Sequence, residues 1–261
     1  MVERYRRGKK KRKLLGNHQK CWIWGRNLVV ETLRGKRWPP VDLLLSDQLS
    51  GEIQSEVQRL ADDLDIPIEW VTPDRIRQVC GTGEHQGFAA RMPEFPYATP
   101  EEFAELVGET ELPLIVVCDR IQDPFNFGAI LRSADGFGVT AIVIPSKQQV
   151  GVTSLVARTS AGAVNHVPIV RVESLGEITK SLKAAGITVV ACTEKTDQPL
   201  SACDFRLPVA IVLGNEGRGV SEELLWNADA KARIPLSGQV ESLNAAVAAA
   251  VVMYEVQRQR S

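Results

Sequence analysis

The chain has 261 residues, of which 44% are apolar and 24% charged, which are proportions typical of a globular protein. No run approaches the roughly 18 consecutive apolar residues that a membrane-spanning helix needs, so we expect no membrane partner. The basic start of the chain has no apolar segment of the kind found in secretory signals, and we expect a cytoplasmic protein.

A net charge of −1 conceals a strongly basic start. Residues 1–20 hold nine lysines and arginines against Glu3 alone, which leaves the rest of the chain with a net charge of −9. A basic arm of this kind neutralises phosphates and gives affinity for nucleic acid without regard to sequence. We expect residues 1–20 to form a disordered tail that contacts RNA; a solvated tail without function is the alternative.

Cysteine and histidine residues show no pattern of metal binding. Five cysteines and three histidines are dispersed, without a C-x-x-C pair, so we expect no metal site. Cys118 and Cys192 fall in apolar runs, where a reduced cysteine behaves as a small hydrophobic residue. A catalytic thiol is therefore not expected.

Residues 21–92 are predicted to form a small α/β unit. Its expected elements are helices over 26–33, 52–64 and 73 to about 79, and strands over 41–46, 66–71 and 87–92. Thr72 with Pro73 is typical of a helix start. The segment 93–100 has three prolines and is the expected linker. Thr99 and Glu102 then form a capping box, which starts the helix that completes the connecting segment 93–111.

Apolar strands alternate with helices over residues 112–261. The expected strands are 114–118, 139–144, 167–172, 187–192, 209–213 and 230–234, and the expected helices are 126–137, 153–159, one capped by Ser174 that runs to about 185, a short one from 221 and a long final one. This alternation predicts an α/β fold with a parallel sheet and helices on both faces. Such sheets bind ligands just beyond the carboxyl ends of their strands.

The first motif is D-R-I-Q-D-P-F-N-F-G-A-I-L-R-S-A, residues 119–134. Asn126 falls where strand gives way to helix, a position at which asparagine often serves as N-cap. Arg132 lies about 120° around the helix from Asn126 and off its core face. It is either a solvated side chain or a clamp for a phosphate, which its planar fork of donors suits.

The second motif is L-G-N-E-G-R-G, residues 213–219. Its three glycines let the backbone pass close to a ligand, but it matches neither the dinucleotide nor the nucleoside-triphosphate fingerprint. Glu216 has no obvious helical partner. It is either a turn residue or a polar group of a site.

The third motif is I-P-L-S-G-Q-V-E-S-L-N, residues 234–244, followed by an alanine-rich helix. Leu243, Val247, Val251 and Tyr254 recur at helical spacing, and the alanines allow close approach of a helix from the same chain or a second subunit. By position, Ser242 could cap this helix, and Asn244 could be a polar residue of its first turn.

In this order and spacing, the three motifs resemble those of the SpoU (TrmH) RNA ribose 2′-O-methyltransferases. The family patterns N-x-G-x-x-x-R-x-A, L-G-x-E-x-x-G and I-P-x-x-G-x-x-x-S-L-N are matched at residues 126–134, 213–219 and 234–244. The chain has Asn244-Ala245-Ala246 where many members have N-V-S. Residues 24–92, through Gly25 and His85-Gln86-Gly87, resemble the small substrate-binding domain of the 23S rRNA guanosine-2′-O-methyltransferase branch.

The resemblance implies a fold, a cofactor and a set of site residues. Family members tie the C-terminal chain into a deep trefoil knot, bind S-adenosylmethionine within it and act as homodimers. The matching active-site positions are Asn126, Arg132, Glu216, Ser242 and Asn244. The cofactor-binding positions are Leu213, Gly214, Ile234, Leu236 and Leu243.

The expected function is therefore S-adenosylmethionine-dependent methylation of a ribose 2′-hydroxyl, of a guanosine in 23S rRNA. In the family, Arg132 corresponds to the proposed general base; because a guanidinium pKa exceeds about 12, a grip on the adjacent phosphate is chemically easier. The alternatives are a tRNA ribose methyltransferase and a non-catalytic RNA-binding protein of ribosome assembly. The N-terminal domain argues against the first, and the intact site residues argue against the second.

Overall fold

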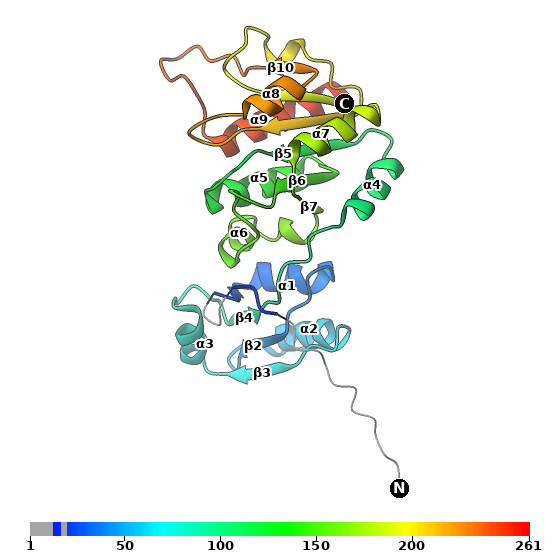
Figure 1. The fold of residues 1–261 in the computed structure, drawn as a ribbon. Coiled ribbons are helices and arrows are strands. Elements are labelled where there is room, and N and C mark those ends of the chain that lie inside the picture. Colours follow the sequence, from blue (N-terminus) through cyan, green and yellow to red (C-terminus); the bar gives the residue numbers. More distant parts are fainter. Residues whose placement is uncertain (1–12, 17–19) are drawn as a thin grey trace. The chain divides into compact units, whose positions relative to one another are not determined.

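The computed structural model describes residues 13–16 and 20–261, so most of the expected basic tail lies outside the described residues. The chain divides into two compact units, Met1–Phe95 and Pro96–Ser261 (Figure 1). The division falls inside the proline-rich segment 93–100.

The first unit is built on a mixed four-stranded sheet of order β1-β4-β2-β3. Its elements are β1 (Trp22–Trp24), α1 (Arg26–Gly35), β2 (Asp42–Ser46), α2 (Gly51–Asp62), β3 (Ile68–Val71), α3 (Pro73–Cys80) and β4 (Phe88–Arg91). Strand β4 is antiparallel to β1 and β2, and β2 is parallel to β3. The sequence pattern does not predict β1, because three residues are too few to show an alternation.

The turn before β4 holds the residues through which this unit resembles a substrate-binding domain. His85 is 5% exposed, and its Nδ1 accepts a hydrogen bond from the Gly87 N–H at 3.0 Å. Burial lowers the pKa of His85, which favours the neutral, accepting ring. The Gln86 side-chain oxygen accepts from the Arg26 N–H at the start of α1. Gly87 has φ +82°, and a Cβ there would lie 2.9 Å from Leu49 Cδ2. These contacts give the three motif residues a packing role.

The second unit is a parallel six-stranded sheet of order β10-β8-β9-β5-β6-β7. Its strands are β5 (Leu114–Cys118), β6 (Ala141–Pro145), β7 (Ile169–Val172), β8 (Thr188–Cys192), β9 (Val209–Leu213) and β10 (Ala230–Ala232). Its α-helices are α4 (Pro100–Glu109), α5 (Pro124–Gly136), α6 (Ser154–Thr159), α7 (Leu175–Ala184), α8 (Glu222–Asn227) and α9 (Ala245–Arg260). The expected capping box of Thr99 and Glu102 is present at the start of α4.

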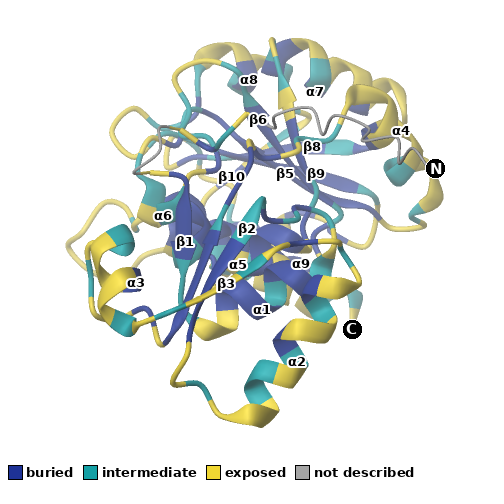
Figure 2. Cartoon of the chain, turned by 90° about the horizontal axis from the view of Figure 1, so that it is seen from below, coloured by how far each residue is buried: buried dark blue, intermediate teal, exposed yellow. Residues whose placement is uncertain are grey.

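Helices cover both faces of this sheet, as the alternating pattern predicts (Figure 2). On one face, Phe103 of α4, Leu182 of α7 and Leu224 of α8 share a core cluster with side chains of the strands. On the other face, α5 packs against α6 and α9. All five residues of β5 and of β9, the two central strands, are buried. The core therefore runs along the two central strands, and the first two motifs begin where these strands end.

Two helix starts differ from the expected ones. Helix α5 begins at Pro124, and its N-cap is Asp123, whose carboxylate accepts from the Phe125 N–H at 2.9 Å. Asn126 therefore lies inside the first turn and is not the cap. Helix α9 is capped by Asn244 and not by Ser242, since the Asn244 side-chain oxygen accepts from the N–H groups of Ala246 and Val247. In both cases the sequence offers more than one polar residue that could serve as N-cap, and the backbone geometry decides which of them does.

Helix α9 runs from the carboxyl edge of the sheet to its amino edge. Its last arginine, Arg260, donates to the backbone oxygens of Leu112 at 2.7 Å, Phe205 and Leu207 at 2.8 Å each, and Pro113 at 3.4 Å. These oxygens belong to the segments that lead into β5 and β9. Partial burial of the guanidinium lowers its pKa, but a guanidinium remains charged. Arg260 thus ties the end of the chain to the two central strands.

Replacement of Arg260 by Met is expected to lower the free energy of unfolding by about 2 kcal/mol, because hydrogen bonds to a charged, partly buried group contribute about 1.5–3 kcal/mol. The control is Arg258→Met two residues earlier, whose exposed ion pair with Glu255 contributes roughly 0–1 kcal/mol. Urea unfolding of the two variants measures the difference. Equal losses would contradict the anchoring role.

Candidate active site

The polar residues of the first two motifs meet at the carboxyl ends of the two central strands. Strands β5 and β9 pair in register up to Cys118 and Leu213, and the Asp119 N–H continues the pairing by donating to the Leu213 oxygen at 2.8 Å. The loop after β5 leads into α5, and the loop after β9 carries Glu216. This edge is the position at which parallel α/β sheets bind ligands.

A chain of hydrogen bonds joins one residue from each motif. The Asn126 side-chain nitrogen donates to a Glu216 carboxylate oxygen at 3.0 Å. The Asn126 oxygen accepts from the Asn244 side-chain nitrogen at 2.9 Å. Asn126 is only 8% exposed, so its amide orientation is set by these two partners. Three of the five expected catalytic residues are thereby brought together, although Glu216 and Asn244 lie 90 and 118 positions from Asn126 in the chain.

The arrangement leaves donors available to a ligand. Each side-chain amide nitrogen carries two hydrogens, and one of them is used by Asn126 toward Glu216 and one by Asn244 toward Asn126. Glu216 also accepts from the Gln122 N–H at 3.5 Å and from the Asn215 side chain at 3.2 Å. These three donors fix the position of the Glu216 carboxylate. Glu216 therefore suits an orienting role better than that of a proton acceptor.

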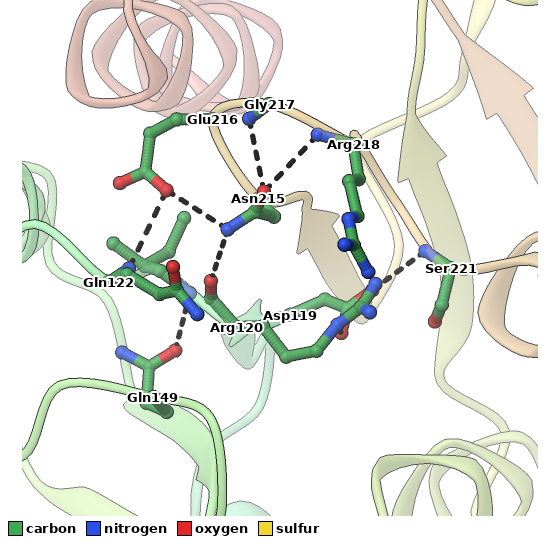
Figure 3. A network of polar contacts seen from close by, with 10 residues as sticks. Asp119, Arg120, Gln122, Gln149, Asn215, Glu216, Gly217, Arg218 and Ser221 are labelled. Carbon is green, nitrogen blue, oxygen red and sulfur yellow. Dashed lines mark hydrogen bonds and ion pairs between the residues drawn. The ribbon is translucent and has the colours of Figure 1, made fainter.

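Asn215 organises the loop after β9, and sequence reasoning did not single it out (Figure 3). Its side-chain oxygen accepts from the N–H groups of Gly217 and Arg218, and its nitrogen donates to the Arg120 oxygen at 2.7 Å. A Cβ on Gly214, the residue before it, would lie 2.2 Å from the Gly219 backbone, so only glycine fits this fold of the loop. An asparagine directly after a glycine, in a glycine-rich loop after a strand, is the available sequence signal.

Asp119 and Arg120, which sequence reasoning also did not single out, connect the same loop to β5 (Figure 3). The Arg120 guanidinium donates to both Asp119 oxygens, at 2.7 and 3.1 Å, and the Ser221 N–H donates to Asp119 at 2.7 Å. Asp119 is 3% exposed, and its hydrogen bond raises the pKa of Arg120. Arg120 has φ +64°, which is uncommon outside glycine and asparagine. The acid thus links the ends of the loop over residues 214–221 to β5.

Arg132 and Ser242 are not part of this hydrogen-bonded chain. Arg132 is exposed on α5, and Ser242 is exposed in the segment between β10 and α9. Within the part of the chain that the structure describes, neither side chain takes a hydrogen bond or ion pair. Both are therefore open to a ligand, but the structure of the chain alone does not draw them together with Asn126.

The expected cofactor positions follow two strands, β9 and β10, and lead up to the start of helix α9. Leu213 is the buried last residue of β9, and Gly214 follows it. Ile234 follows β10, which is shorter than expected, and Leu243 is half-buried directly before Asn244. The segment 235–242 is exposed, with Leu236 at 38%. Glycine-rich backbone beside exposed apolar side chains fits a cofactor such as S-adenosylmethionine, which has both polar and apolar parts.

The thiols offer no nucleophile at this edge. Cys118 ends β5, and burial, with the nearby Glu216 and Asp119 carboxylates, raises its pKa to about 12. Burial likewise raises the pKa of Cys192, to about 12. Over residues 13–16 and 20–261, no three His, Cys, Asp or Glu side chains are grouped as metal ligands. In the same residues, no helix is long and apolar enough to cross a membrane.

Two family models match the chain and together span both units. Residues 113–254 match the SpoU rRNA methylase family, and residues 22–98 match the RNA 2′-O ribose methyltransferase substrate-binding family. A putative TrmH-family tRNA/rRNA methyltransferase of Bacillus subtilis, YacO, is 34% identical over 94% of this chain and 98% of its own length.

Solved structures agree with the family models. An AdoMet-bound rRNA methyltransferase from Sinorhizobium meliloti is 25% identical, with a TM-score of 0.77 over 92% of this chain and 87% of its own. A TrmH/SpoU tRNA-modifying enzyme from A. aeolicus is 29% identical, but its match covers only 61% of this chain, and 81% of its own, with a TM-score of 0.53. The chain belongs to the SpoU (TrmH) family of S-adenosylmethionine-dependent tRNA/rRNA methyltransferases.

Proposed function

We propose that the protein methylates the 2′-hydroxyl of a guanosine ribose in 23S rRNA. The observation that carries the proposal is the convergence of Glu216, Asn126 and Asn244, one residue from each motif, at the ligand-binding edge of the sheet. These motifs are the ones that resemble the ribose 2′-O-methyltransferases, and the guanosine rests on the resemblance of residues 24–92 to the 23S rRNA branch.

The unit that precedes the sheet favours ribosomal RNA over tRNA. The match to the S. meliloti rRNA methyltransferase covers 92% of the chain, whereas the match to the A. aeolicus tRNA-modifying enzyme covers 61%. Residues 22–98 fit the substrate-binding model. We assign RNA binding to residues 21–92, catalysis to residues 112–261 and the connection to 93–111. The basic tail over residues 1–20 adds phosphate contacts in this proposal.

Bound S-adenosylmethionine supplies a methyl group on a positively charged sulfur. The cofactor would supply this methyl group to the ribose oxygen by one in-line displacement, in which the O–C bond replaces the C–S bond and the hydroxyl proton passes to water. Positioning of the two reactants can supply roughly 7–11 kcal/mol of the barrier. Leu213, Gly214, Ile234, Leu236 and Leu243 would hold the cofactor, and Ser242 would hold its edge or that of the substrate. The chain's remaining task is to orient the hydroxyl.

Four side chains share that task. The free amide hydrogens of Asn126 and Asn244 donate to the ribose, and Glu216 keeps both amides in the required orientation. Arg132 has no partner among the described residues and grips the phosphate next to the ribose. Intact Asn126, Arg132, Glu216, Ser242 and Asn244 disfavour a non-catalytic assembly protein.

A homodimer and a trefoil knot complete the proposal. Val247, Val251 and Tyr254 lie on one stripe of α9 and are 50%, 37% and 57% exposed, although the core takes a different face of this helix. A second copy would cover them, and sedimentation equilibrium that finds a monomer contradicts this.

The knot is favoured because the chain runs through β10 to the sheet edge and returns through residues 233–244 to Asn126. Cytoplasmic location stays a prediction.

Transfer of labelled methyl groups from S-adenosylmethionine to unmethylated 23S rRNA and, separately, to bulk tRNA tests the function. We expect label on the ribose of one guanosine of 23S rRNA, found by mapping the modified nucleotide. Label on tRNA alone would contradict the assignment to rRNA. No label on either RNA, with the cofactor still bound, would favour the assembly protein.

Arg132→Ala is expected to lower kcat about 100-fold or more, which would leave almost no turnover, because a side chain that orients the reacting group acts mainly in the transition state. Affinity for S-adenosylmethionine, measured by calorimetry, should stay unchanged. Arg258→Ala on the neighbouring helix α9 removes an equal charge and should keep full activity. Retained turnover of the Arg132 variant would remove it from the mechanism.

A further inference from the structure

Phe125 is an exposed aromatic residue beside the most buried residue of the hydrogen-bonded chain. It is the second residue of α5 and exposes 59% of its surface, whereas Asn126 exposes 8%. A single exposed apolar side chain is common on protein surfaces, so exposure alone carries no function. Its place is what distinguishes Phe125, because it is the exposed residue directly before Asn126 in the chain, whereas Phe127 on the other side is fully buried.

The first turn of α5 holds the backbone of Phe125 in a defined position. Pro124 occupies the first helical position, where its fixed φ suits the helix. The Asp123 carboxylate accepts the Phe125 N–H at 2.9 Å. The ring therefore projects from a capped turn and not from a loose loop, and a group held in this way loses little entropy on binding a ligand.

Phe125 and Arg132 share one stripe of the helix. Seven residues correspond to about two turns, or roughly 10 Å along the axis, so the two side chains leave the helix within about 20° of each other. Ala129, the residue between them on this stripe, is small and half-buried. Side chains on a helix lean toward its N-terminus, which brings the Arg132 guanidinium back toward Phe125.

An aromatic face, side-chain amides and a guanidinium in this order suit the base, ribose and phosphate of one nucleotide. Proteins that recognise single-stranded RNA stack bases on aromatic side chains, and arginine binds phosphate with a fork of donors. We propose that Phe125 stacks on the base of the nucleotide to be methylated and thereby places its ribose between Asn126 and Arg132. This inference rests on the proposed RNA methyltransferase function.

Stacking on Phe125 would not determine which base is methylated. Every base has a face that can stack on an aromatic ring, so stacking on Phe125 holds the nucleotide without selecting guanosine. Choice of the base must then come from other contacts. Phe125 is a positioning residue for the ribose, and its loss should affect all RNA substrates in the same proportion.

The test compares Phe125→Leu, which keeps an apolar side chain without an aromatic face, with Phe125→Trp, which restores one. The matched control is Trp226→Leu, since Trp226 is 88% exposed and lies on α8, over the opposite face of the sheet. We expect kcat/KM for RNA to fall about tenfold or more in Phe125→Leu and to stay near the native value in Phe125→Trp and Trp226→Leu. Affinity for S-adenosylmethionine and the oligomeric state should be unchanged in all three.

Each other outcome overturns the inference in a recognisable way. Native kcat/KM in Phe125→Leu, or an equal loss in Phe125→Trp, shows that no aromatic face is used. Loss of cofactor affinity or of the dimer in Phe125→Leu assigns the ring to the cofactor or to the partner subunit. If the native protein labels RNA and any of these results is found for a variant, only the role of Phe125 is contradicted. Native protein that labels no RNA contradicts the proposed function, and the inference with it.

Discussion

The side chain of Asn126 is the interaction on which the candidate site depends. Its nitrogen binds Glu216, its oxygen binds Asn244, and it is almost fully buried between them. A neutral amide can satisfy a carboxylate on one side and another amide on the other, which neither an ionised carboxylate nor a lysine or arginine in its place could do. Three segments that are distant in the chain are held together by one side chain with both donor and acceptor capacity.

The fold supplies this amide with partners at both of its atoms. Parallel pairing of β5 and β9 places the start of α5 beside the loop over residues 214–221, and Asp119 fastens that loop to β5. Asn244 uses its oxygen to cap α9 and its nitrogen to bind Asn126. Because Arg260 anchors the other end of α9, the cap and the site are fixed by the same helix. Stability at the amino edge of the sheet thus contributes to geometry at the carboxyl edge.

Much of this architecture is predictable from the sequence, because buried parallel strands are continuous apolar runs and the helices between them begin with recognisable caps. The parallel sheet, the helices on both faces and the capping box of Thr99 are confirmed. The cap of α5 is not predicted correctly, since Asp123 and Asn126 are both good caps and only the backbone decides between them. The partners of Asn215 and of the Asp119–Arg120 pair could not be predicted, because they lie more than 90 residues away or depend on an unusual backbone conformation.

A double-mutant cycle on the two partners of Asn126 tests the central claim most directly. Glu216→Ala removes one partner, and Asn244→Ser removes the other while keeping a residue that can cap α9. If Asn126 couples the two, either change alone releases its amide, so kcat/KM for methyl transfer in the double variant should be little lower than in the poorer single variant. Independent losses that multiply, for example two of about 100-fold giving about 10,000-fold, would show that Asn126 does not connect the motifs.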